Sequence, residues 1–187
     1  MNIFSIFGAI GLLWSIALNL NAESSHHHHD DAPQQQAHLH GYTELMLAIE
    51  GSRLEINFES PASAIVGFEH RATSSEQLQL IEDAKKMLES SAELFSFSGG
   101  ACSISSASAD FSAVAMSNKE HQAHAQSHSE IAANYQFDCA QAQSLKAIEV
   151  NLIKRFPSIE NVRVMWLTDA KQGSVELTSK NNLIRLR

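Results

Sequence analysis

Histidine is the residue type whose number and spacing point most directly to chemistry in this chain. Ten of the 187 residues are histidine, and none follows His128. Neutral imidazole nitrogens are common ligands of zinc and other divalent metals. The histidines fall into four groups: the run His26, His27, His28 and His29; the pair His38 and His40; His70, beside Glu69; and the set His121, His124 and His128. This grouping predicts metal binding.

The pair His38 and His40 occupies alternate positions at the start of a predicted strand. One parity of this strand holds Leu39, Thr43, Leu45, Leu47 and Ile49, and the two histidines have the opposite parity. Alternate strand positions lie roughly 7 Å apart on one face, so two imidazoles can converge on a single ion. Two hydrogen-bonded surface histidines would give the same pattern, and the spacing alone leaves that alternative open.

The spacing of His121, His124 and His128 is i, i+3 and i+7 within a polar stretch, residues 117–130. We expect this stretch to be a mobile loop. If it became helical on binding, the three imidazoles would share one face and could chelate one ion. Two glutamates in the same stretch add carboxylate ligands, Glu120 and Glu130. The alternative is a solvated polar loop without a ligand.

Glu69 and His70 are adjacent, and adjacent residues of an extended chain point in opposite directions. His70 is therefore the better metal ligand of the two, while Glu69 suits the orientation of an imidazole. The run of four histidines lies in residues 23–36, a polar stretch without periodicity that predicts a disordered arm. These four are expected to be auxiliary metal ligands, although a solvated arm without a role is the alternative.

Imidazole and carboxylate ligands without thiolate suit Zn²⁺, and nickel or copper(II) can bind the same groups. Because ligation requires neutral imidazole, we expect affinity to fall as pH drops through the histidine range.

The first 22 residues contain no charged side chain and are almost wholly apolar up to Leu18. This pattern predicts a secretory signal peptide, residues 1–22, cleaved after Ala22. A membrane anchor is the competing interpretation, but no basic flank is present to stop transfer. We therefore expect an exported protein without stable membrane insertion after cleavage.

Charge and cysteine content limit the remaining possibilities. The chain has 21 acidic and 13 basic residues, a net charge of −8, and no basic patch, which argues against nucleic-acid binding. The two cysteines, Cys102 and Cys139, form no C-x-x-C pair, so in an exported protein we expect one structural disulfide. If it joins antiparallel strands, Ile104 pairs with Phe137, and the hairpin tip falls near Glu120 and His121.

Hydrophobic periodicity predicts how the chain folds around these groups. A capping-box pattern at residues 73–76 precedes an apolar stripe and predicts a helix over 74–90, covering the first hairpin. A second stripe predicts a helix over 141–155. Strands are expected at 37–49, 53–59, 101–104, 131–139, 162–167, 175–177 and 183–186. The prediction is one α+β domain, residues 37–187, with mainly antiparallel sheet, two helices and the order β-β-α-β-β-α-β-β-β.

Four segments of the chain resemble the ZrgA family of periplasmic zinc-binding proteins. They are Ala-His-Leu-His-Gly at 37–41, Ser-Pro-Ala-Ser-Ala-Ile-Val-Gly-Phe-Glu-His at 60–70, Ala-Cys at 101–102, and a histidine-containing insertion before Tyr-x-Phe-x-Cys at 135–139. The resemblance implies an exported zinc binder of Gram-negative bacteria, made under zinc limitation and working beside a zinc uptake system. It also implies His38, His40 and His70 as ligands, joined by His121, His124 and His128. The insertion is sparser in histidine than the dense His-Asp runs common in the family.

Two other function classes remain as alternatives. A secreted zinc hydrolase could use a His-x-His strand pair, but the sequence has no His-Glu-x-x-His and offers no evident general base beyond Glu69. An adhesin or structural domain would carry its histidines incidentally. The leading hypothesis is a zinc protein that captures or buffers Zn²⁺ and is not an enzyme.

Overall fold

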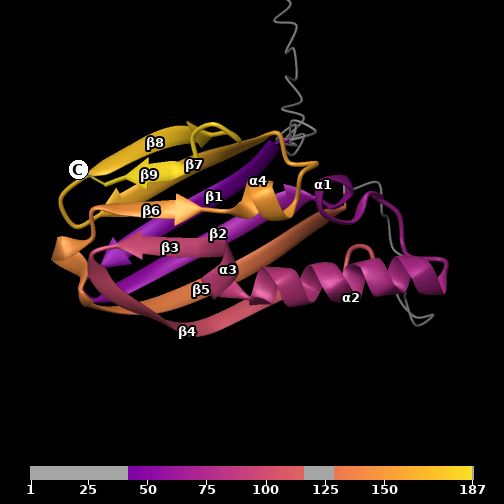
Figure 1. Cartoon of the computed structure of the whole chain (residues 1–187). Helices are drawn as coiled ribbons and strands as arrows, with labels where there is room; N and C mark the ends of the chain where they lie inside the picture. Colours follow the sequence, from indigo (N-terminus) through magenta and orange to yellow (C-terminus); the bar gives the residue numbers. More distant parts are fainter. Residues whose placement is uncertain (1–41, 116–128, 187) are drawn as a thin grey trace, which may run out of the picture. The chain divides into compact units, whose positions relative to one another are not determined.

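The computed structural model describes residues 42–115 and 129–186, which form two packed sheets with the longest helix at one end (Figure 1). The strands are β1 (Tyr42–Glu50), β2 (Arg53–Pro61), β3 (Phe95–Ser98), β4 (Gly100–Asp110), β5 (Glu130–Gln141), β6 (Ala147–Val150), β7 (Asn161–Thr168), β8 (Gln172–Leu177) and β9 (Leu183–Arg185). The helices are α1 (Ala62–Val66), α2 (Ser75–Glu89), α3 (Ser91–Leu94), α4 (Leu152–Arg155) and the 3-10 turn η1 (Ala142–Ser144).

The larger sheet has six strands in the order β4-β5-β2-β1-β7-β8. The predicted hairpin is confirmed, because β1 and β2 pair antiparallel with Leu47 opposite Ile56. Their inward residues are buried, as the alternation predicts: Thr43, Leu45, Leu47, Ile49, Leu54, Ile56 and Phe58. One pairing departs from the antiparallel pattern, since β1 and β7 run parallel.

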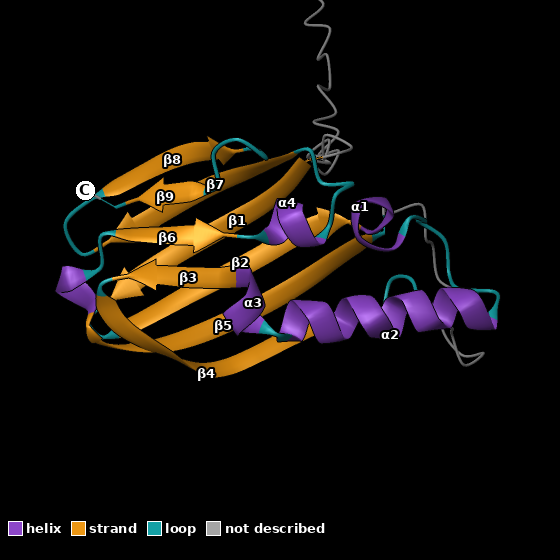
Figure 2. Cartoon of the chain, in the orientation of Figure 1, coloured by secondary structure: helices purple, strands orange, loops and turns teal. Residues whose placement is uncertain are grey.

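The smaller sheet, in the order β3-β6-β9, packs against the inner face of the larger one (Figure 2). Aromatic side chains join the two layers at β3 and β5. The ring of Phe95 meets Tyr135 edge-on at 5.0 Å between centroids, and Phe97 meets Phe137 at 4.8 Å. Such pairs contribute roughly 1 kcal/mol each beyond the area they bury.

The helix predicted over 74–90 is confirmed as α2. Its N-cap is Ser74, whose hydroxyl oxygen accepts a hydrogen bond from the Gln77 amide at 3.3 Å. The cap therefore uses Ser74 and Gln77 in place of the predicted Thr73 and Glu76, and the Gln77 side chain accepts from the amide of Thr73, the residue before the N-cap, at 2.8 Å. The apolar stripe packs inward, but the helix contacts the sheet more at β4 than at the first hairpin.

The end of α2 is anchored by a buried tyrosine. Tyr135 of β5 is 1% exposed, and its hydroxyl donates to the Leu88 carbonyl oxygen at 2.8 Å. Burial, reinforced by the nearby Glu89 carboxylate, raises the pKa of Tyr135, so the hydroxyl keeps its proton and remains a donor at neutral pH. The bond therefore satisfies one of the carbonyls that a helix C-terminus leaves unpaired.

Replacing Tyr135 with phenylalanine tests this anchor. The variant keeps the ring packing but leaves the Leu88 carbonyl without its donor, so we expect a loss of about 1–2 kcal/mol in the free energy of unfolding. Urea denaturation followed by circular dichroism measures it. Tyr42→Phe is the control, because Tyr42 is only half-buried and should change stability by less than about 0.5 kcal/mol. Equal effects of the two substitutions would contradict the assignment.

The helix predicted over 141–155 is wrong. The segment contains the end of β5, η1, the short strand β6 and the single-turn helix α4. The stripe residues are buried as predicted, namely Leu145, Ile148, Leu152 and Phe156, but Ala147 and Val150 are buried too. The buried side chains of this segment are therefore more than one face of a helix would bury. In addition, β6 gains backbone hydrogen-bond partners on both sides, from β3 and β9. Tertiary pairing therefore overrides the helical pattern. Over residues 42–115 and 129–186 the α+β fold has four α-helices, and its element order differs from the prediction.

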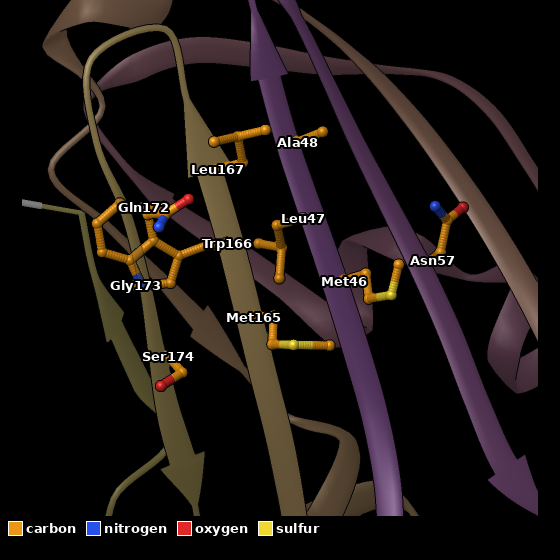
Figure 3. Close-up of a pocket in the computed structure, with 10 residues that line it drawn as sticks. All are labelled: Met46, Leu47, Ala48, Asn57, Met165, Trp166, Leu167, Gln172, Gly173 and Ser174. Atoms are coloured by element: carbon orange, nitrogen blue, oxygen red, sulfur yellow. The ribbon is translucent and has the colours of Figure 1, made fainter. Parts of the chain in front are cut away.

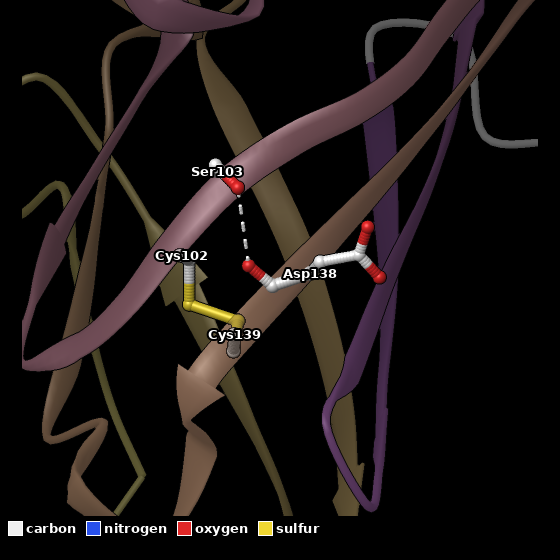
Figure 4. Close-up of a disulfide and its surroundings, with 4 residues drawn as sticks. All are labelled: Cys102, Ser103, Asp138 and Cys139. Atoms are coloured by element: carbon white, nitrogen blue, oxygen red, sulfur yellow. Dashed lines mark hydrogen bonds between the residues drawn. A yellow bond between two sulfur atoms is a disulfide. The ribbon is translucent and has the colours of Figure 1, made fainter.

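The predicted disulfide is confirmed. Cys102 and Cys139 lie directly opposite each other on β4 and β5, with an S–S distance of 2.03 Å (Figure 4). The expected pairing of Ile104 with Phe137 is also present, and a bulge follows between Ile104 and Ser106. The Ser103 hydroxyl donates to the Asp138 carbonyl beside it at 3.5 Å. The predicted hairpin tip lies outside the described residues.

Within residues 42–115 and 129–186, no helix is long and apolar enough to cross a membrane.

Candidate metal centre

Three segments that carry or adjoin predicted ligands meet at one end of the larger sheet. β1 begins there at Tyr42, β2 ends there at Pro61, and β5 begins there at Glu130, which is paired with Pro61. His40 precedes Tyr42 by two residues, and His128 precedes Ser129 directly. The Phe-Glu-His segment follows Pro61 through α1.

The short helix α1 sets the direction of the Phe-Glu-His segment. It buries Ala62, Ala64 and Val66 and ends at Gly67, whose φ of 85° is left-handed and whose amide donates to the Ser63 carbonyl at 3.1 Å. A glycine suits this position because other residues adopt such a φ only at a cost. The chain then turns outward to His70, whose ring stacks on Phe68 at 5.1 Å between centroids.

His70 is exposed, and one of its ring nitrogens is already engaged. Nδ1 lies 2.8 Å from the Arg71 carbonyl oxygen, which can only accept, so Nδ1 carries the proton of the neutral ring. The Nε2 lone pair is then the one that can bind a metal. A backbone carbonyl on the other nitrogen is the usual way in which a metal-binding imidazole is oriented.

The segment around His70 is joined to the start of β5. The Ser129 hydroxyl donates to the Glu69 carbonyl at 2.6 Å, and the Ala62 amide donates to the Ser129 carbonyl at 2.8 Å. The Glu69 carboxylate accepts from the Ser63 hydroxyl at 2.7 Å, which holds the side chain against α1.

The same segment is also joined to the turn after β4. The Arg71 guanidinium donates to the Ala115 carbonyl at 3.1 Å, and more weakly to that of Ser112 at 3.4 Å. The Ala72 amide donates to the Val114 carbonyl at 2.8 Å. The turn itself begins at Asp110, whose carboxylate accepts from the Ser112 amide at 2.8 Å, and this hydrogen bond lowers the pKa of Asp110.

Two of the ligands predicted from the sequence, Glu69 and His70, belong to the described residues. The other predicted ligands lie outside them, namely His26, His27, His28, His29, His38, His40, His121, His124 and His128. Glu130, expected as a loop carboxylate, is the first residue of β5. Among the described residues, no three His, Cys, Asp or Glu side chains form a group that could hold a metal ion.

Sequence reasoning missed the residues that organise this end of the sheet. Arg71, Ser63 and Ser129 make the hydrogen bonds above, yet none belongs to a metal-binding motif. Their signal is position, because each lies within one to seven residues of a predicted ligand, and Ser63 also belongs to the segment 60–70 that carries the family resemblance.

Comparison with known proteins identifies the family of this chain. A search of curated proteins returned no match. The model of a family described as "ZrgA family zinc uptake protein" matches residues 37–186, which include every strand and helix described above. The chain therefore belongs to the ZrgA family of zinc uptake proteins.

Proposed function

We propose that the protein is exported to the periplasm, where it captures or buffers Zn²⁺ and assists its uptake without catalysing a reaction. Its ligands would be His38, His40 and His70, joined by His121, His124 and His128, with Glu69 as an auxiliary group. The partner would be a component of a zinc uptake system, in line with the family to which the chain belongs.

One observation carries this proposal: the His70 segment is hydrogen-bonded to the residues on both sides of the 116–128 stretch. On one side the Arg71 guanidinium donates to the Ala115 carbonyl, and on the other the Ser129 hydroxyl donates to the Glu69 carbonyl. Three predicted ligands belong to the stretch between those anchors, His121, His124 and His128. Consecutive Cα atoms are about 3.8 Å apart, so His128 is within reach of the His70 segment through Ser129.

The start of β1 also lies beside the elements that lead to His70, which supports a shared site. Glu44 is opposite Glu59 in the hairpin, so the beginning of β1 lies beside the end of β2, where α1 and the His70 segment follow. His40 is two residues before Tyr42, a distance of at most about 7 Å along an extended chain. Imidazoles from three separate segments can bind an ion without a preformed cage, which suits reversible capture.

Metal analysis of the purified protein tests the proposal. After dialysis against trace Zn²⁺ at neutral pH, we expect at least one tightly bound Zn²⁺ per chain. Substituting His38 and His40 together by alanine should reduce that stoichiometry or weaken the binding, whereas an incidental role would leave both unchanged. Less than one Zn²⁺ per wild-type chain would contradict zinc capture.

The same dialysis at lower pH provides a control. Protonated imidazole cannot ligate, and the unperturbed pKa of histidine is about 6.5, so bound Zn²⁺ should be largely released by about pH 5. Retention at pH 5 would point to carboxylate ligands instead. Esterase, phosphatase and peptidase assays on the zinc-loaded protein should be negative, and turnover in any of them would favour a zinc hydrolase.

A further inference from the structure

The outer face of the larger sheet carries an exposed apolar patch that the zinc proposal does not use. Met46 and Met165 are 50% and 44% exposed, and Leu167 is 54% exposed. With Ala48 they line an open depression of about 630 Å³ on β1 and β7, whose rim includes Asn57 and Ser174 (Figure 3). Single exposed apolar residues are normal on protein surfaces, whereas two exposed methionines on neighbouring strands form a patch that indicates a binding function.

The two methionines occupy paired positions on neighbouring strands. Met46 is the register partner of Met165 across the parallel β1–β7 pairing. Neighbouring strands are about 4.8 Å apart, so the two flexible side chains can bring their sulfur atoms together above the sheet. In Figure 3 the Met165 side chain extends from β7 toward β1, and Met46 and Asn57 follow on the next two strands. Asn57 is the partner of Met46 on β2, and its amide oxygen is a third donor in the same row.

The surroundings of this pair favour a cation. The neighbouring row across the same face contains Glu59, Glu44, Arg163 and Glu176, paired in that order from β2 to β8. Glu55, opposite Ala48, adds a further carboxylate. Four of these side chains are acidic and one, Arg163, is basic. Arg163 forms an ion pair with Glu44 at 3.0 Å, so acidic groups remain in excess around the depression. Their combined field raises the local concentration of positive ions.

We propose that Met46 and Met165 form a binding site for a soft monovalent cation such as Cu⁺ or Ag⁺. Thioether sulfur is a soft ligand that selects soft ions such as Cu⁺ over Mg²⁺ or Ca²⁺. This site is separate from the proposed zinc ligands and does not depend on them. A second property distinguishes the two sites, because a thioether has no proton to lose or gain in the physiological range, whereas imidazole does.

A silver titration at about pH 5 tests the proposal, because imidazoles are then protonated and compete poorly. The protein is labelled with ¹³C at the methionine methyl groups, and Ag⁺ is added in chloride-free buffer. We expect the methyl resonances of Met46 and Met165 to shift along one common curve that saturates at one Ag⁺ per pair. Met87, half-buried on α2 against the core, is the internal control and should not shift.

Conservative variants complete the test. Met46→Leu and Met165→Leu keep the volume and the exposure, so the fold should persist, and each should weaken Ag⁺ binding at the remaining methionine by about tenfold or more. Met87→Leu should leave it unchanged. Separate titration curves for the two methyl groups, no shift in either, or equal binding in the leucine variants would overturn the proposal. A shift of both methyl groups with Zn²⁺ at neutral pH would overturn the selectivity for soft ions.

Discussion

Removing the disulfide by substituting Cys102 and Cys139 together with alanine is expected to lower the free energy of unfolding by about 4 kcal/mol. The cross-link joins residues 37 apart in sequence, and in the chain-entropy model closing a loop of that length restricts the unfolded chain by this amount. Its position increases its importance, because among the described strands β4 lies at an edge of the sheet and pairs only with β5. Alanine is used because Cys139 is 1% exposed, and serine would bury a hydroxyl there.

Urea denaturation of the wild type and the double variant measures this effect, and reductant provides the matched control. Reductant should destabilise the wild type by a similar amount and leave the variant unaffected. Zinc affinity should change little in the double variant. Cys102 lies eight residues along β4 from Asp110, roughly 25 Å from the turn that Arg71 contacts. A loss below about 1 kcal/mol would show that the chain-entropy argument fails here.

Substituting His70 with alanine is expected to weaken zinc binding by about 100-fold or more, because the ion loses a ligand whose ring is already oriented. The Arg71 carbonyl fixes the Nδ1 proton, so Nε2 is presented without reorganisation. Calorimetric titration, or competition with a zinc chelator, gives the affinity at neutral pH.

Two further variants separate ligation from packing at this residue. His70→Phe keeps a ring that can stack on Phe68 but has no nitrogen, so it should lose as much affinity as His70→Ala. Phe68→Leu removes the aromatic partner while keeping the imidazole and should change affinity only a few-fold. Wild-type affinity in His70→Ala, or recovery in His70→Phe, would show that the residue is not a ligand.

The fold was predictable from the sequence where local pattern and tertiary environment agree. The β1–β2 hairpin and α2 have clear periods of 2 and 3.6, and the cysteine pair sets the register of β4 against β5. Prediction failed around β6, because the buried residues at helical spacing are divided among the end of η1, β6 and α4, and β6 is a short strand flanked by β3 and β9. Those partners are distant in sequence, and a periodic pattern cannot show which segment supplies the hydrogen bonds.

The candidate site was predictable in composition more than in organisation. The family resemblance and the adjacency of Glu69 and His70 made His70 a candidate ligand, but the arginine and serine contacts around it depend on how β4, β5 and α1 meet. The Arg71 side chain donates to carbonyl oxygens about 40 residues later in the chain, and the Ser129 hydroxyl donates to the carbonyl of Glu69, 60 residues earlier. Backbone carbonyls carry no residue-type signal, so only the folded chain identifies these contacts.

The parallel pairing of β1 with β7 has a consequence for the order in which the chain can fold. The β1 edge opposite β2 stays unpaired until residues 161–168 are available, whereas β2, β4 and β5 can pair earlier. Until β7 pairs, an apolar strand edge is open to other chains. Sheet completion therefore waits for the C-terminal quarter of the protein, and a chain that ends before β7 would expose the centre of its own core.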